Sequence, residues 1–226
     1  MKIAAIIVAA GFGKRMNSRK PKQFLALAGK PVLWHILKKF IQADRFSEIV
    51  LVINRDYWHF CQQEIIKKYK FKQVKLIVGG KERQDSVCRG LKVIHPCDLV
   101  CIHDGVRCMV PLQVIKDTVA AARKYGAAIA AVPVKDTIKA GNNNAFVTKT
   151  IDRGSLWNIQ TPQIFEYKLI MKAYERAYQQ KFYGTDDAML VERLGEKVKI
   201  VQGSYDNLKI TTPTDLLIAE KLLRKG

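Results

Sequence analysis

The sequence predicts an α/β fold in which a mostly parallel β-sheet is covered by helices on both faces. Two observations support this prediction. Short apolar runs alternate with stretches of helical periodicity along most of the chain, as expected for βαβ units. The length of 226 residues fits one α/β domain better than two, so we expect a single domain over residues 1–226.

Five apolar runs are predicted to be strands, and helical patterns lie between them. The predicted strands cover residues 3–9, 49–53, 74–78, 99–102 and 127–134. The predicted helices between them cover residues 32–43, 57–69, 85–94 and 112–125. Ligands of such sheets bind in the crevice beyond the carboxyl ends of the strands. We therefore expect the functional residues in the loops 11–23, 79–83 and 103–108.

The alternation ends after Pro133, where a hairpin is predicted instead. Residues 135–151 contain two extended segments around three consecutive asparagines, 142–144, a composition typical of a hairpin turn. An isolated hairpin is marginally stable in water. We expect this arm, about residues 135–153, to protrude and to pack on a second subunit. The alternative is a hairpin that folds back over its own domain.

The remaining chain returns to helical patterns. Residues 166–180 and 186–194 are predicted helices, and residues 197–202 a strand. A last helix is expected to begin at Thr212, because Pro213 suits the first helical position and Asp215 lies three residues after the cap.

The net charge of +19 favours polyanionic partners, which include nucleic acid, an anionic membrane face and phosphorylated small molecules. Solvated lysines of a lysine-rich protein would give the same charge, so the charge alone does not show whether the protein binds a polyanion. No apolar run approaches the length needed to cross a bilayer. Apolar residues 3–10 resemble a short signal peptide, but the cations that follow disfavour secretion. The five cysteines form no CxxC or metal-ligand pattern, which is typical of reduced thiols in a cytoplasmic protein.

The first of the predicted loops, AAGFGKRM (9–16), allows three interpretations. A dinucleotide-binding fingerprint would need a third glycine where Met16 stands, and a P-loop would need a Gly-Lys-Ser/Thr ending. The third interpretation is a glycine-rich turn whose backbone amides face a polyphosphate, reinforced by cationic side chains. This phosphate clamp is favoured by the cations that crowd behind the glycines, Lys14, Arg15, Lys20 and Lys22.

Seven segments together resemble one enzyme family. They are AAGFGKRM (9–16) with KPKQF (20–24), GGKERQDSV (79–87), HDGVRC (103–108), VPVKDTIK (132–139), TIDRGSLWNIQTPQIF (150–165), TDDA (185–188) and DNLKITTP (206–213). In this order they resemble the 2-C-methyl-D-erythritol 4-phosphate cytidylyltransferases of the non-mevalonate isoprenoid pathway. The resemblance runs from the first predicted strand to the last helix. It implies a Rossmann-like three-layer sandwich with a protruding hairpin arm and a homodimer formed through that arm.

The implied reaction joins CTP to 2-C-methyl-D-erythritol 4-phosphate and releases pyrophosphate. The attacking phosphate monoester has a second pKa near 6 and is largely dianionic at neutral pH, so no general base is needed. The main requirement is to neutralise charge on the phosphates, which cations and a metal do. By resemblance, Arg15 and Lys22 hold the triphosphate, Lys209 contacts the α-phosphate, and Arg153 binds the acceptor phosphate from the other subunit. Mg²⁺ is the implied cofactor, held mainly by water and phosphate oxygens.

The nucleotide-binding residues implied by the resemblance lie in three loops, and they are Ala9, Ala10, Gly11, Gly13, Lys14, Gly80, Lys81, Ser86 and Gly105. Gly79 and Gly80 let the backbone approach the cytosine closely, with Ser86 beside it. Lys81 departs from the family, in which we expect an acidic residue, and this puts a side-chain contact there in doubt.

The implied acceptor-binding residues are Asp104, Arg107, Thr137, Thr161 and Thr185. Asp104 faces either the metal or the polyol hydroxyls. Gly105, Val106 and Cys108 stand where the family more often has two alanines and a proline. We expect His103 to be structural, because nothing in the mechanism needs a proton shuttle.

Three other functions are less favoured than cytidylyl transfer to methylerythritol phosphate. A ribitol 5-phosphate cytidylyltransferase would share the chemistry, but the arm and acceptor segments favour methylerythritol phosphate. A basic nucleic-acid-binding protein would explain the charge, yet no recognisable binding module is evident, so we expect no specific nucleic-acid partner and no membrane partner. An NAD-dependent oxidoreductase is disfavoured by Met16 and by the missing acidic residue.

Overall fold

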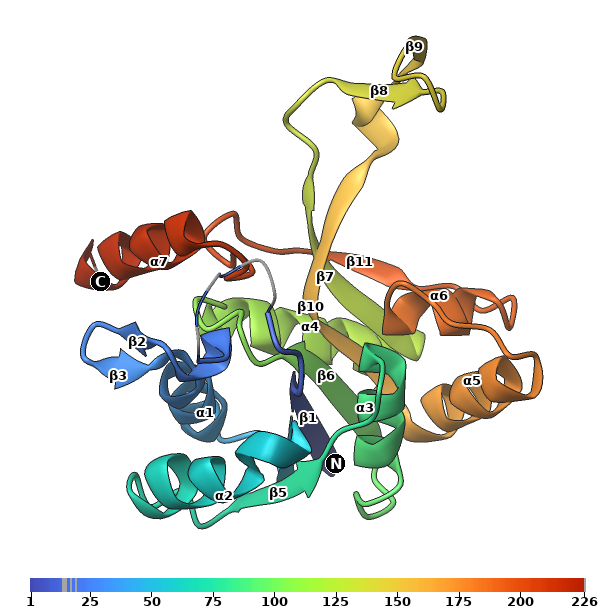
Figure 1. Ribbon diagram of the computed structural model, residues 1–226. Coiled ribbons are helices and arrows are strands. Elements are labelled where there is room, and N and C mark those ends of the chain that lie inside the picture. Colours follow the sequence, from blue (N-terminus) through green and yellow to red (C-terminus); the bar gives the residue numbers. More distant parts are fainter. Residues whose placement is uncertain (14–15, 17, 19, 226) are drawn as a thin grey trace.

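The computed structural model describes residues 1–13, 16, 18 and 20–225 and centres on a seven-stranded sheet of order β11-β7-β10-β6-β1-β4-β5 (Figure 1). Its strands are β1 (Ile3–Ala9), β4 (Glu48–Ile53), β5 (Val74–Val78), β6 (Leu99–Asp104), β7 (Ala127–Pro133), β10 (Trp157–Glu166) and β11 (Lys199–Gln202). All strands run parallel except β10, which is antiparallel to both β6 and β7. The predicted α/β class and mostly parallel sheet are therefore confirmed.

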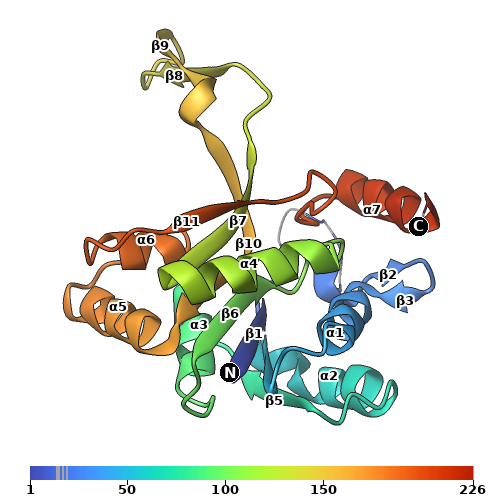
Figure 2. The ribbon, with the colours of Figure 1, turned by 180° about the vertical axis from the view of Figure 1, so that it is seen from behind.

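Helices cover both faces of this sheet, which makes the Rossmann-like three-layer arrangement expected from the sequence. One face packs against α1 (Val32–Gln42), α2 (Trp58–Cys61) with the π-helical Gln62–Lys67, and α4 (Leu112–Tyr125). The other packs against α3 (Arg83–Leu91), α5 (Tyr167–Gln179) and α6 (Asp187–Glu192). Figure 2 shows α4 lying across the sheet. Side chains alternate between the two cores along each strand: Ala5 and Ile7 of β1 face one, and Ala4 and Ile6 the other.

The last helix, α7 (Pro213–Lys225), begins where the sequence predicts. The Thr212 hydroxyl accepts a hydrogen bond from the Asp215 backbone N–H at 3.3 Å, and Asp215 accepts one from the Thr212 N–H at 2.8 Å. This reciprocal pair satisfies two N–H groups that would otherwise lack partners at the helix start. Two short strands, β2 (Ala26–Leu27) and β3 (Lys30–Pro31), form a separate small sheet before α1.

The predicted hairpin is present and projects away from the body of the protein, as both ribbon views show (Figures 1 and 2). It consists of β8 (Ile138–Gly141) and β9 (Val147–Ile151), paired antiparallel as a sheet of their own. The Asn142 side chain closes the turn by accepting hydrogen bonds from the backbone N–H groups of Asn144 and Phe146. Phe146 is 70% exposed at the tip. The hairpin therefore does not fold back over its own domain.

Strand β10 was not predicted from the sequence. Its run WNIQTPQIFE contains a proline and three buried polar residues, Gln160, Thr161 and Gln163. Proline is uncommon inside a central strand, and the pairing with β7 shifts register between Ile159 and Gln163 to accommodate it. The polar side chains are satisfied by residues distant in the sequence, which no local pattern reveals.

In the described part of the chain, no helix combines the length and apolarity needed to cross a bilayer. All five cysteines are free thiols, and Cys61, Cys101 and Cys108 are buried. Burial raises the pKa of the Cys61 thiol to about 12, which keeps it protonated and unreactive at neutral pH.

Candidate active site

A pocket of about 400 Å³ lies at the carboxyl ends of β1 and β6, where the sheet topology predicts a ligand. Its lining brings together ten of the predicted site residues, which are Ala9, Ala10, Gly11, Gly13, Lys22, Gly80, Lys81, Ser86, Asp104 and Lys209. Gly105 lies between the lining residues Asp104 and Val106. The predicted residues Lys14 and Arg15 lie outside the described part of the chain.

The glycine loop after β1 is held in place by Gln23, which is almost fully buried. Its side-chain amide donates to the Ala9 carbonyl at 2.7 Å and to the Gly11 carbonyl at 3.3 Å. Gly13 has φ +66°, and a Cβ added there would lie 3.0 Å from the Lys22 side chain. Glycine is therefore needed at 13 both for the left-handed backbone and for the close approach of Lys22, whose exposed fraction is 9%.

The segment after β5 presents bare backbone to the pocket. A Cβ at Gly80 would lie 2.3 Å from the Cβ of Asp85, so a side chain cannot be added there without a shift. The Ser86 hydroxyl accepts from the Gly80 N–H at 3.1 Å and donates to the Glu82 carbonyl at 3.1 Å. These bonds fix the loop and leave one lone pair of the hydroxyl for a ligand donor.

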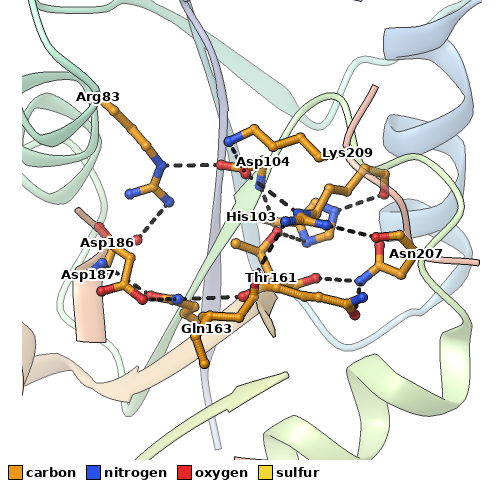
Figure 3. Close-up of polar contacts among 12 residues, drawn as sticks. Arg83, His103, Asp104, Thr161, Gln163, Asp186, Asp187, Asn207 and Lys209 are labelled. Atoms are coloured by element: carbon orange, nitrogen blue, oxygen red, sulfur yellow. Dashed lines mark hydrogen bonds and ion pairs between the residues drawn. The ribbon is translucent and has the colours of Figure 1, made fainter. Parts of the chain in front are cut away.

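Asp104 is the centre of a cluster of cations (Figure 3). Its carboxylate lies 2.9 Å from the Lys209 Nζ, 3.2 Å from the Arg83 Nε and 3.6 Å from the Arg107 Nε. Burial by itself would raise the pKa of Asp104, but these three neighbouring charges hold it well below its usual range. The carboxylate is therefore ionised at neutral pH, and it holds three cations at one point.

His103 and Thr161 support Asp104 from inside the protein. The Asp104 backbone N–H donates to the Thr161 hydroxyl at 3.0 Å, which lies 3.0 Å from His103 Nδ1. His103 Nε2 lies 3.2 Å from the Arg107 carbonyl oxygen, which can only accept, so Nε2 carries the proton and Nδ1 accepts from Thr161. Burial lowers the pKa of His103 to about 4, so the ring is neutral. The expectation of a structural role for His103 agrees with this geometry.

The loop that carries Lys209 is anchored by Asn207, which is fully buried. The Asn207 side chain donates to the Gln160 side-chain oxygen at 3.0 Å and to the Thr161 carbonyl at 2.9 Å, and the Asn207 backbone carbonyl accepts from Arg107 at 2.8 Å. Arg107 thus contacts both the Asp104 carboxylate and the Lys209 loop. The position of Lys209 therefore depends on residues of β10 and of the loop after β6.

Arg83 is a site residue that the sequence reasoning missed, together with Asp187 and Gln163. Its guanidinium contacts Asp104 through Nε and Asp187 at 2.8 Å through Nη2 (Figure 3). Gln163 accepts from the Asp187 backbone N–H at 3.1 Å. Arg83 lies in GGKERQDSV and Asp187 in TDDA, so both motifs contained the signal. Their pairing across 104 positions of sequence was not visible.

Three predicted site residues lie away from this pocket. Thr137 and Arg153 are exposed on the arm, where the Arg153 guanidinium donates to the Lys135 carbonyl. Thr185 is exposed in the loop before α6, with its hydroxyl 3.7 Å from the Met189 sulfur. None of the three is part of the described lining of the pocket in the same chain. Thr161 sits behind Asp104, and its contact with an acceptor stays a prediction.

Comparison with known proteins agrees with this geometry. A family model described as 2-C-methyl-D-erythritol 4-phosphate cytidylyltransferase matches residues 3–225. Relatives with that name are 47% identical in Caldanaerobacter subterraneus subsp. tengcongensis, over all of both chains, and 48% identical in Clostridium acetobutylicum, over 98% of this chain and 97% of that one.

Solved structures show the same similarity. The 4-diphosphocytidyl-2C-methyl-D-erythritol synthase of Anaerococcus prevotii has a TM-score of 0.86 at 37% identity, covering 99% of this chain and 98% of that one. The 2-C-methyl-D-erythritol 4-phosphate cytidylyltransferase of Thermus thermophilus has a TM-score of 0.82 at 31% identity, covering 99% and 100%. The chain belongs to the 2-C-methyl-D-erythritol 4-phosphate cytidylyltransferase family.

Proposed function

We propose that this chain transfers the cytidylyl group of CTP to 2-C-methyl-D-erythritol 4-phosphate. The products are 4-diphosphocytidyl-2-C-methyl-D-erythritol and pyrophosphate. The observation that carries the proposal is a pocket lined by three glycines, Gly11, Gly13 and Gly80, together with the cations Lys22 and Lys209. Lys209 lies beside Asp104. Such a surface suits a nucleoside triphosphate, because backbone amides and ammonium groups both stabilise phosphate charge.

In the reaction, an oxygen of the acceptor phosphate forms a bond to the α-phosphorus of CTP, and the bond from that phosphorus to the bridging α–β oxygen breaks. Pyrophosphate leaves with the electron pair. The attacking phosphate is largely dianionic near pH 7, so no side chain has to remove a proton. The buried, neutral His103, with its pKa lowered to about 4, is not needed as a base.

The chain's own cations stabilise the charge that develops on the phosphates. The Lys209 side chain is 40% exposed, so its ammonium is available to the pocket while Asp104 holds it. Lys22 approaches from the glycine loop. Arg15 shares this role by resemblance to the family. Preorganised charges of this kind contribute more than the same charges in water, because they need no reorganisation during the reaction.

We propose Mg²⁺ as the cofactor. Among the described residues, no group of three His, Cys, Asp or Glu side chains forms a metal cage. The pocket offers the carboxylate of Asp104, and one carboxylate with phosphates and water is a donor set that Mg²⁺ accepts. When bound, the ion would neutralise charge on the triphosphate oxygens.

We also propose that the arm of one chain reaches the site of a second, so that the enzyme is a homodimer. Support comes from Arg153 and Thr137, predicted acceptor residues that lie on the projecting arm and away from the pocket of their own chain. The exposed Phe146 at the tip offers apolar surface for the contact. A cytoplasmic location is proposed on the five free thiols.

The test is incubation with CTP, Mg²⁺ and one polyol phosphate at a time, scored by pyrophosphate release and by the mass of the product. We expect turnover with 2-C-methyl-D-erythritol 4-phosphate and CTP. Excess chelator should abolish it, and ATP and GTP should be poor donors. Faster turnover with ribitol 5-phosphate, or equal turnover with purine nucleotides, contradicts the proposal.

A further inference from the structure

Three consecutive side chains of α3 reach from the nucleotide segment to α5, to α6 and to the loop between them. Arg83 contacts Asp187 at 2.8 Å. Asp85 accepts hydrogen bonds from the hydroxyls of Tyr178 at 2.7 Å and Tyr183 at 3.1 Å. Between them, Gln84 contacts the backbone of the loop itself. Residues 80–83 and Ser86 line the proposed CTP pocket, and the loop 182–186 carries Thr185, which the family resemblance assigns to the acceptor. These contacts therefore join the nucleotide segment to the predicted acceptor loop.

Gln84 uses its whole side-chain amide for this contact. Its nitrogen donates to the Phe182 carbonyl at 3.0 Å, and its oxygen accepts from the Gly184 N–H at 2.9 Å. A carbonyl can only accept and an N–H can only donate, so the two bonds fix the orientation of the amide. Gln84 is 5% exposed although it is polar, so its burial depends on these bonds.

Other contacts also hold this loop: the Phe182 N–H donates to the Ala177 carbonyl at 2.8 Å, the Tyr183 hydroxyl donates to Asp85 at 3.1 Å, and the Gln163 amide donates to Asp186 at 2.8 Å. A Cβ at Gly184 would lie 2.9 Å from Leu190 and 3.0 Å from the Asp186 carbonyl, so the loop is tightly seated at that point. Thr185 and Tyr183 are themselves exposed. The Gln84 amide adds a contact to the main chain at both Phe182 and Gly184, immediately before Thr185.

We propose that Gln84 is a positioning residue, which holds the loop 182–186 against the nucleotide segment and so sets the affinity for the acceptor phosphate. The proposal rests on the proposed function and deepens it. Arg83 also holds Asp104, and Asp85 also completes the capping box at the start of α3, so their replacement would disturb other contacts. The described side-chain hydrogen bonds of Gln84 are both with the loop.

The first test is steady-state kinetics of Gln84→Ala. Without the amide, the loop occupies its binding-competent position for a smaller fraction of the time, and the apparent affinity falls by that fraction. Losing two hydrogen bonds predicts that the KM for 2-C-methyl-D-erythritol 4-phosphate rises about tenfold, with the KM for CTP and kcat changed less than about twofold. Gln179→Ala is the matched control, because Gln179 is an exposed glutamine whose amide contacts Glu175 on its own helix.

Gln84→Glu tests the chemistry of the contact. A carboxylate there faces the Phe182 carbonyl with no proton to donate, whereas the protonated acid can donate as the amide does. Burial raises the pKa of such a carboxyl group, so protonation falls in an accessible range. The ratio of acceptor KM values, variant to native, should therefore decrease as pH is lowered from 8 to 5.5. The acceptor phosphate titrates in the same way in assays of both proteins, so its effect cancels in the ratio of the two KM values.

Hydrogen exchange of the Gly184 amide gives a readout that needs no acceptor. We expect it to exchange at least about fivefold faster in Gln84→Ala than in the native protein. The inference is overturned if the KM values of both substrates rise together, if neither changes, or if the Gln84→Glu ratio is independent of pH. If the native protein itself shows no turnover with CTP and methylerythritol phosphate, the proposed function fails, which is a separate outcome.

Discussion

Asp104 and Arg153 are both expected to act in one reaction, yet they lie in opposite kinds of environment. Asp104 is 6% exposed and is fixed by three cations, a threonine and a buried histidine. Arg153 lies on an exposed arm, and its contact is with the backbone of that arm. The described pocket is thus built from one chain, whereas Arg153 is proposed to act in the site of a second chain.

Pre-organisation within one chain and the proposed assembly between chains would then serve the same site. A buried cluster joined by hydrogen bonds and ion pairs has its final geometry before the substrate binds, because folding has already fixed its side chains. An isolated hairpin is marginally stable in water, so the proposed partner subunit would stabilise the arm on binding. The two regions should therefore respond differently to mutation, to dilution and to pH.

The largest expected effect is on turnover, from the nucleotide half. We predict that Lys22→Ala lowers kcat by roughly 100- to 1000-fold, the scale for losing one transition-state charge contact. Binding of CTP, measured by calorimetry, should weaken less, because the other phosphate contacts remain. An unchanged kcat with a raised KM would mean that Lys22 binds ground state and transition state alike.

The second prediction tests whether Arg153 works in the other chain. Lys22→Ala and Arg153→Ala proteins should each be nearly inactive as homodimers. Co-expressed in equal amounts, random pairing makes about half of the dimers mixed, and each mixed dimer has one undamaged site, so about a quarter of native activity should return. Differently tagged chains allow mixed dimers to be purified. If mixed dimers form without recovery, Arg153 does not act across the interface.

The third prediction concerns the arm tip. Phe146→Lys places a charge where an apolar side chain is proposed to be covered, and burying a phenylalanine contributes about 1.5–3 kcal/mol. The dimer dissociation constant, measured by sedimentation, should rise roughly 10-fold or more. The free energy of unfolding of the body should not change. Lys139→Ala, which alters an exposed residue of the same hairpin, is the control. An unchanged dissociation constant would place the interface elsewhere.

The smallest effect is a pH dependence of stability. The folded-state pKa of His103 is lowered from 6.5 to about 4, so between these values the unfolded chain binds more protons than the folded one. The contribution of His103 to the free energy of unfolding is complete above pH 6.5. It is lost as pH falls below that value, at up to about 1.4 kcal/mol per pH unit. Urea denaturation at pH 7, 6 and 5 measures this slope. In His103→Gln, whose side chain cannot titrate, the free energy of unfolding should depend less steeply on pH. The same slope in both proteins would mean that His103 is not the cause of the pH dependence.

Most elements of the fold were predictable because their signals are local. β1, β5 and α4 have the predicted bounds, and β4, β6 and β7 differ by one or two residues. Such runs are recognisable because burial on both faces demands apolar side chains at almost every position. β10 was missed because its buried polar groups find partners only in the folded chain, as Gln163 does with Asp186 and Asp187.

The residues of the site were predictable by motif, and their connections were not. Glycines and cations next to strand ends indicated a phosphate pocket, and the structure brings ten of the predicted residues to it. The bridge from Asp104 through Arg83 to Asp187 joins three separate motifs. No spacing within one motif encodes that contact.

By itself, the sequence determined the α/β class, the hairpin, and a pocket of glycines and cations at the strand ends. These depend on short-range periodicity and on residue types, which can be read locally. Only the tertiary structure decided which charges share Asp104, how Gln84 ties one loop to another, and which predicted residues stay on the arm. Such contacts join residues that are distant in the chain, and they exist only after the sheet has brought the strand ends together.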